Sequence, residues 1–185
     1  MKKIIFFATL LPFLSFGQKY EISDLAGYGG LIGPISNAYQ YGTIKSGFSN
    51  LLSFDYKLNR TFSVGATYLL NSWNATGNSF GVAANCHYYN VYCGIDISDM
   101  MFHSIPGSEK NTPEITYKPT LSTGVHIGGE NKIYKCLYSK EQIGVNYSSL
   151  TFSYNTQFAN GAYMPAQYHE NCTLIYILLG LACRL

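Results

Sequence analysis

Residues 115–127 read ITYKPTLSTGVHI, and the alternation within this stretch decides the fold. One side of an extended chain here carries the apolar residues Ile115, Tyr117, Leu121, Val125 and Ile127, together with Pro119 and Thr123. The opposite side carries Thr116, Lys118, Thr120, Ser122, Gly124 and His126. Because successive side chains of a β-strand point to opposite faces, the stretch predicts a strand with one apolar and one polar face.

The same alternation recurs along the chain, most clearly in residues 48–58, 62–70 and 175–185. We therefore predict an all-β chain of eight strands, at about residues 22–33, 47–58, 62–70, 80–88, 91–100, 115–127, 144–158 and 173–185. Residues 128–143 are too long for a tight turn and leave two alternatives open. The seventh strand starts early with a bulge, or an added hairpin makes ten strands.

Residues paired across antiparallel strands share a face, and this rule predicts two tight turns. A three-residue turn at 59–61 keeps the apolar faces of its two strands together. A two-residue turn at 89–90 does the same for the next pair and sets Cys86 opposite Cys93. Longer polar stretches separate the other strands, at residues 34–46, 71–79, 101–113 and 159–170. Short turns at one end and long loops at the other are typical of closed, up-and-down transmembrane barrels.

The composition agrees with an outer surface covered by lipid. Only 12% of the residues are charged, about half the proportion of soluble proteins, whereas 16% are aromatic. The chain has no basic stripe, so nucleic acid is not expected as a partner. The alternative is a soluble periplasmic carrier of the lipocalin type, which would place apolar residues inside and charges outside.

The first 17 residues have the order of a secretory signal peptide. Lys2 and Lys3 precede the apolar residues 4–14, and the small-x-small sequence 15–17 follows. Such an apolar segment is too short for a transmembrane helix, which needs about 20 residues. We therefore expect a signal peptide at 1–17 and a mature outer-membrane barrel at 18–185.

Two segments resemble the small OmpX/OmpA-type outer-membrane β-barrels of Gram-negative bacteria. Residues 180–185, GLACRL, are similar to the closing strand of such barrels, and residues 86–94, CHYYNVYCG, are similar to an aromatic-rich periplasmic hairpin. The family usually ends on an aromatic residue, and Leu185 departs from that pattern, as does Cys183. The resemblance implies an outer-membrane location and contact with lipid and lipopolysaccharide. It also implies recognition of the last strand by the barrel-assembly machinery.

No residue set predicts catalysis, a cofactor or a metal. His87 and His126 fall on inward faces, and His103 and His169 fall in loops. A lipid A deacylase would need a serine close to its histidine, but His126 is followed by Ile and Gly. The five cysteines, at 86, 93, 136, 172 and 183, match no zinc spacing. Cys86 and Cys93 are either disulfide-bonded or two small residues that face lipid.

Six charged residues are predicted to point into the barrel: Asp55, Lys57, Asp96, Glu114, Lys118 and Arg184. They form either an ion-paired filling or a narrow conducting path. Eight strands enclose just enough room for side chains, which favours the filling. The glycine-rich stretches 27–30 and 126–129 open no helix, so they are expected to relieve crowding within strands rather than to bind phosphate.

These patterns predict a non-enzymatic outer-membrane barrel whose loops bind an unknown surface partner. The loop aromatics and methionine that could anchor such a partner, or else sit in the lipid headgroup layer, are Tyr39, Tyr41, Trp73, Tyr163, Met164 and Tyr168. The alternatives are a lipid A-modifying outer-membrane enzyme and the soluble periplasmic carrier.

Overall fold

The structure is a computed structural model, and it describes residues 19–32, 46–72, 77–102, 116–157 and 163–185. The strands are β1 Tyr20–Ile32, β2 Ser46–Lys57, β3 Phe62–Ser72, β4 Gly77–Tyr88, β5 Val91–Phe102, β6 Thr116–Lys118, β7 Thr120–Tyr134, β8 Leu137–Gln157 and β9 Tyr163–Arg184. Within these ranges no helix is long and apolar enough to cross a membrane. The predicted signal peptide lies outside the described residues and stays a prediction.

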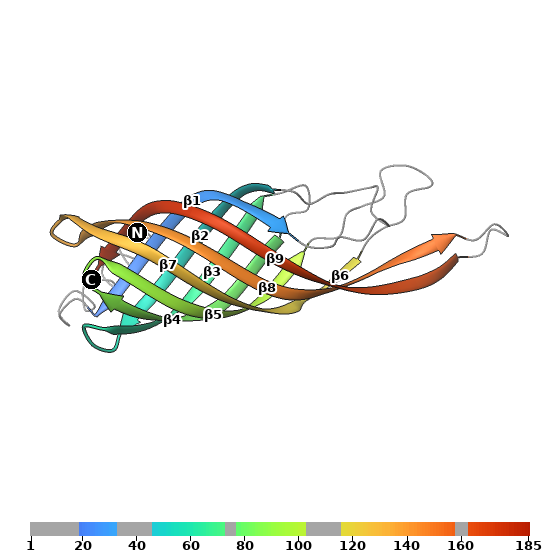
Figure 1. The fold of residues 1–185 in the computed structure, drawn as a ribbon, viewed down its shortest axis with the longest axis horizontal. Helices are drawn as coiled ribbons and strands as arrows, with labels where there is room; N and C mark the ends of the chain where they lie inside the picture. Colours follow the sequence, from blue (N-terminus) through green and yellow to red (C-terminus); the bar gives the residue numbers. More distant parts are fainter. Residues whose placement is uncertain (1–18, 33–45, 73–76, 103–115, 158–162) are drawn as a thin grey trace, which may run out of the picture.

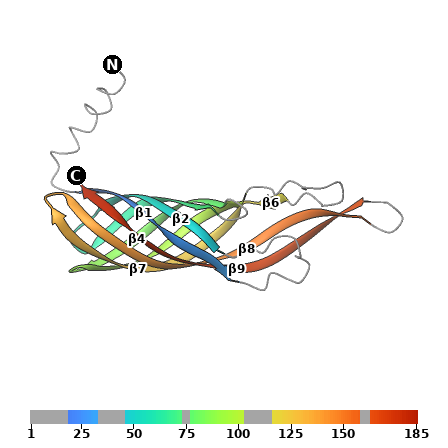
Figure 2. The same cartoon turned by 90° about the horizontal axis from the view of Figure 1, so that it is seen from above.

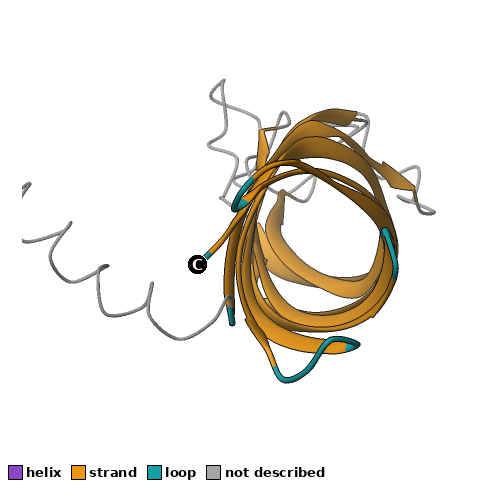
Figure 3. Ribbon diagram, turned by 90° about the vertical axis from the view of Figure 1, so that its left-hand side faces the viewer, coloured by secondary structure: helices purple, strands orange, loops and turns teal. Residues whose placement is uncertain are grey.

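The strands form one antiparallel ring, which Figure 3 shows from its end. The strands from β1 to β5 each pair with the next, β5 pairs with β7 and β7 pairs with β8. β9 pairs with both β8 and β1, which closes the ring. β6 and β7 are two parts of a single strand that is interrupted at Pro119, and both pair with β8. The barrel therefore has eight strands, as predicted, and the alternative of ten strands is wrong.

Both predicted tight turns are confirmed. Leu58 N donates to Phe62 O at 2.9 Å across the three-residue turn at 59–61. Cys86 pairs with Cys93 across the two-residue turn at 89–90. The parity of the apolar residues was sufficient to predict these connections, because a slip of one residue would move every side chain to the wrong face.

The uncertain stretch 128–143 is a continuation of two neighbouring strands. β7 runs on to Tyr134, and β8 begins at Leu137, so the seventh strand of the barrel starts early. The bulge lies in the preceding strand, where the register with β8 shifts between Lys132 and Tyr134. Lys135 at the turn adopts a positive φ of 40°.

The prediction of a long loop at 159–170 is wrong, because most of this stretch is strand. β8 and β9 stay paired from Leu150 opposite Glu170 to Gln157 opposite Tyr163. Figures 1 and 2 show this pair projecting beyond the rest of the barrel as a two-stranded arm. The polar composition suggested a loop, but extended segments can satisfy their backbone hydrogen bonds by pairing with each other. His169 therefore lies in β9, where its Nδ1 is 2.9 Å from Thr151 Oγ1.

The polarity of the barrel is the reverse of that of a soluble protein. Large apolar side chains cover the outside; Leu121, for example, is 67% exposed. Charged and polar side chains fill the inside, where Glu21 is 1% exposed. Water would disfavour such an exterior, whereas the hydrocarbon of a membrane would favour it. The alternative of a soluble carrier, which requires an apolar interior, is therefore wrong.

Candidate functional site

The barrel interior gathers the ionisable side chains at the end where β1 begins and β9 ends, here called the terminal end. Glu21 from β1 is the centre of this group. Its Oε1 lies 2.7 Å from Lys140 Nζ, and its Oε2 lies 2.7 Å from Arg184 Nε and 3.4 Å from Lys57 Nζ. Three cations from β8, β9 and β2 thus surround one carboxylate inside the ring.

Arg184 extends this cluster across the lumen. Its Nη2 atom pairs with the carboxylate of Glu130 on β7, so one guanidinium joins two carboxylates. Its guanidinium carbon also lies 3.9 Å from the centre of the Tyr138 ring, within the range of a cation–π contact. The C-terminal strand is therefore held by charge as well as by its backbone ladder.

A serine, a histidine and a glutamate beside this cluster are arranged as in the catalytic triad of a hydrolase. Ser63 Oγ lies 3.0 Å from His87 Nε2, and His87 Nδ1 lies 3.7 Å from Glu130 Oε1. Yet Ser63 is 1% exposed, and the interior cavity described below is lined by neither Ser63 nor His87. Because Ser63 is buried and does not line that cavity, the trio supports a hydrogen-bonded filling rather than acyl transfer.

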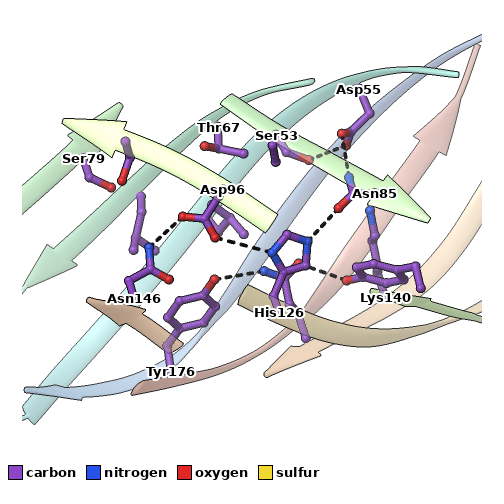
Figure 4. A pocket seen from close by; sticks show the side chains of 16 residues that line it. Ser53, Asp55, Thr67, Ser79, Asn85, Asp96, His126, Lys140, Asn146 and Tyr176 are labelled. Carbon is purple, nitrogen blue, oxygen red and sulfur yellow. Dashed lines mark hydrogen bonds and ion pairs between the residues drawn. The ribbon is translucent and has the colours of Figure 1, made fainter. Parts of the chain in front are cut away.

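A second polar group occupies the middle of the barrel around His126 (Figure 4). Asn85 Nδ2 donates to Asp55 Oδ1 at 3.2 Å, so its Oδ1 is the atom that lies 2.6 Å from His126 Nε2. An amide oxygen only accepts, and His126 Nε2 therefore carries a hydrogen. On the other side of the ring, His126 Nδ1 lies 3.5 Å from Asp96 Oδ2, and Asn146 Nδ2 donates to Asp96 Oδ1 at 2.8 Å.

A small cavity of about 30 Å³ lies beside this group and is lined by residues of both polar clusters. His126 Nδ1, Asp96 Oδ2 and Asn146 Oδ1 have no hydrogen-bond partner among the described residues. A buried water needs about 10–15 Å³ and two to four polar partners, so the cavity is large enough for about two waters. It is too small for a continuous aqueous channel.

Bulky tyrosines complete the filling, and inward glycines make room for them. Tyr92 OH donates to Gln142 Oε1 at 3.0 Å, and Gln142 Nε2 donates to Tyr176 OH at 3.2 Å. A Cβ added at Gly128 would meet the Tyr92 ring, and one added at Gly144 would meet the Tyr176 ring. The expectation that Gly128 relieves crowding is thus confirmed.

Most of the predicted inward residues are where the sequence placed them. Asp55, Asp96, His87 and His126 are buried, and Lys57 and Arg184 are paired inside the ring. The structure also brings in residues that were not predicted for the site, chiefly Glu21, Glu130, Lys140, Asn85, Asn146 and Tyr176. Glu21, Glu130 and Lys140 lie outside the strands predicted from the sequence, and side-chain parity does not say which residues meet across the lumen.

Lys118 is exposed, and its predicted inward position is wrong. Lys118 pairs with Thr151, and Ser122 pairs with Ser148. Four residues along β6 and β7 therefore correspond to three residues along β8. This one-residue shift around Pro119 exchanges the two faces.

Several other predicted residues are not loop residues or are not described. Tyr163, Met164 and Tyr168 lie in β9 instead of a loop. Glu114, His103, Tyr39, Tyr41 and Trp73 lie outside the described residues.

All five cysteines are described, and all are free thiols in the structure, Cys86 and Cys93 included. The described residues contain no cluster of three or more His, Cys, Asp or Glu side chains arranged to hold a metal ion. Cys172 is buried, with its Sγ 2.9 Å from Ser148 Oγ.

No family model matches the sequence, and no curated protein sequence matches it. Two solved structures share its fold. Outer membrane protein AlkL, determined in lipid bilayers, is 10% identical, with a TM-score of 0.56 and 90% coverage of both chains. Outer membrane protein OprG from Pseudomonas aeruginosa is 11% identical, with a TM-score of 0.57, over 89% of this chain and 95% of the other.

The closed ring, the apolar exterior and the polar filling together define a small transmembrane β-barrel of the Gram-negative outer-membrane type. The predicted fold class is confirmed, and the predicted outer-membrane location agrees with both the lipid-facing surface and the shared fold.

Proposed function

We propose that this protein is a non-enzymatic, non-conducting outer-membrane barrel that presents the β8–β9 arm to partners outside the cell. The observation that carries the first half is the charge cluster around Glu21. Its members come from β1, β2, β8 and β9, and Glu130 adds β7. Side chains that meet from five strands across a narrow lumen support an interior closed to ions.

The arm supports the second half of the proposal. β8 has 21 residues and β9 has 22, whereas a tilted strand crosses a bilayer with about 9–11 residues. The surplus lies at the end opposite the terminal end, where Figure 1 shows the arm projecting. With the termini in the periplasm, this arm lies outside the cell. We further propose that lipopolysaccharide surrounds the barrel and that the assembly machinery recognises β9.

The enzymatic alternative is not favoured by the described residues. A lipid A-modifying enzyme would need its reactive groups at the lipid-facing surface, and the Ser63–His87–Glu130 trio points into the lumen. The filling thus accounts for these residues without catalysis.

Planar bilayer recording tests the closed lumen. The purified barrel is expected to give no regular conductance steps in concentrated KCl, while a reference porin inserted in the same way shows that the assay detects channels. Regular steps from the wild-type protein would contradict a filled interior.

A shortened arm tests its role in binding. A variant with residues 150–170 replaced by a short turn is expected to keep heat-modifiable gel migration, because the ring itself remains complete. Cells that display this variant should lose any attachment to one another or to protein-coated surfaces that the full protein confers. Equal attachment by both would remove the arm from the proposed function.

A further inference from the structure

Two cysteines lie side by side at the terminal end of the barrel. The β7–β8 hairpin reaches past the turn between β4 and β5, where Glu130 N donates to Asn90 O at 2.8 Å. Cys136 occupies the second position of the turn at the tip of this hairpin. Cys183 lies in β9 and pairs with Leu137, the residue that follows Cys136.

Backbone and side-chain contacts hold the two residues together. Arg184 N donates to Cys136 O at 2.8 Å, so the ladder between β8 and β9 continues into the turn. The thiol of Cys183 is in hydrogen-bonding contact with the thiol of Cys136. Both side chains are half-buried, and Cys136 lies in the turn at the tip of the hairpin, at the end of the barrel.

The other cysteines have different surroundings. Cys86 and Cys93 face each other, but on the outer surface, which is apolar and faces lipid. Cys172 is buried beside Ser148 within the ring. Among the five cysteines, the pair at the terminal end is the one that combines thiol–thiol contact with a position at a turn.

We propose that Cys136 and Cys183 are joined by a disulfide in the mature protein. Exported proteins mature in an oxidising compartment, where such bonds form and persist. One thiolate attacks a disulfide of the oxidant, a periplasmic dithiol oxidase or glutathione disulfide, and forms a mixed disulfide. The second thiolate then displaces the oxidant. Two protons leave, one S–S bond forms, and the two electrons reduce the oxidant to thiols.

This bond would tie the β7–β8 turn to the closing strand. Cys183 precedes Arg184, which binds Glu21 on β1 and Glu130 on β7. A covalent link at this position would hold the guanidinium in its cluster and would protect the last residues of β9 from fraying. The sequence placed only Cys86 and Cys93 opposite each other, because position along the strands does not show that a turn residue meets β9.

Thiol counting tests the proposal on the whole protein purified from outer membranes. The sample is quenched in acid, denatured and alkylated with a maleimide polymer that adds a fixed mass to each thiol. The wild-type chain has five cysteines and is expected to gain three adducts without reductant and five after reduction. The single variants Cys136→Ser and Cys183→Ser should each gain four adducts under both conditions.

The double variant Cys86→Ser, Cys93→Ser is the matched control, and it should still gain two fewer adducts without reductant than with it. Peptide mapping of the unreduced wild-type chain needs no variant and should recover the Cys136 and Cys183 peptides as one linked species. Five adducts from the unreduced wild-type chain would overturn the proposal. A linked species that joins any other two cysteines would overturn it as well.

Discussion

Arg184 Nε lies 2.7 Å from Glu21 Oε2, and this ion pair joins the last strand of the barrel to the first. The same carboxylate also binds Lys140 at 2.7 Å and Lys57 at 3.4 Å. Charges inside a protein are tolerated when they are paired and hydrogen-bonded, and removal of one partner leaves the others uncompensated. Glu21 is therefore the residue on which the terminal end of the lumen depends.

Glu21→Gln tests this dependence, because it keeps the shape of the side chain and removes its charge. Lys57, Lys140 and Arg184 would then lose their common partner, and we expect the free energy of unfolding to fall by about 3–5 kcal/mol. Urea unfolding in lipid vesicles, followed by gel migration, measures the change. Glu141→Gln is the control, since Glu141 is exposed, and it should cost less than about 0.5 kcal/mol. Equal losses would refute the central role of Glu21.

Ser63→Ala separates a structural role from a catalytic one. The hydroxyl makes one buried hydrogen bond, to His87, and its loss should cost about 1 kcal/mol of stability. Because Ser63 is buried and does not line the interior cavity, a fluorophosphonate probe should leave the folded wild-type barrel unlabelled. Labelling of the wild-type protein that disappears in Ser63→Ala would show that the Ser63 hydroxyl is a reactive nucleophile.

Gly128 and Gly129 are neighbours that should respond differently to replacement by alanine. A Cβ at Gly128 would meet the Tyr92 ring and the backbone carbonyl of Glu141, whereas one at Gly129 would meet the Glu141 side chain, which can move. We expect Gly128→Ala to lower stability by about 1–3 kcal/mol and Gly129→Ala to have a much smaller effect. The urea midpoint of each variant measures the difference. A similar cost at both positions would mean that the inward glycines do not make room for the tyrosines.

The lipid-facing surface can be tested with arginine. Val125 is 58% exposed on the outside of the ring, and Val125→Arg should cost about 2–4 kcal/mol in a bilayer. Tyr134, 64% exposed beside the turn of the β7–β8 hairpin, is the control, and Tyr134→Arg should cost about 1 kcal/mol or less. Unfolding in vesicles compares the two variants. If Val125→Arg is as harmless as Tyr134→Arg, the outer surface does not face hydrocarbon.

The eight strands and the two tight turns were predictable because the side-chain period of a strand is two and lipid makes one face uniformly apolar. The turn at 59–61 and the pairing of Cys86 with Cys93 follow from that parity alone. The β8 half of the arm lies within the strand predicted at 144–158. The β9 half, residues 163–170, was predicted as a loop, because its polar residues lack the apolar face that identifies a membrane strand. Lys118 was predicted on the wrong face, because the alternation of side chains does not reveal the one-residue shift in register around Pro119.

The sequence predicted which kinds of residue fill the candidate site, but not their contacts. Inward parity identified Asp55, Asp96, His87 and His126 as interior residues. It could not pair Ser63 with His87, or Arg184 with both Glu21 and Glu130, because such contacts depend on the diameter and stagger of the ring.

Glu21 and Arg184 are separated by 163 positions in the sequence. The barrel closes only when β9 pairs with β1, and until then one edge of β1 has unpaired backbone hydrogen-bonding groups. Contacts at such long range make folding slow, and during that wait the exposed edge could pair with a neighbouring chain. We therefore expect the chain to need chaperones before its insertion, as a consequence of the closed topology.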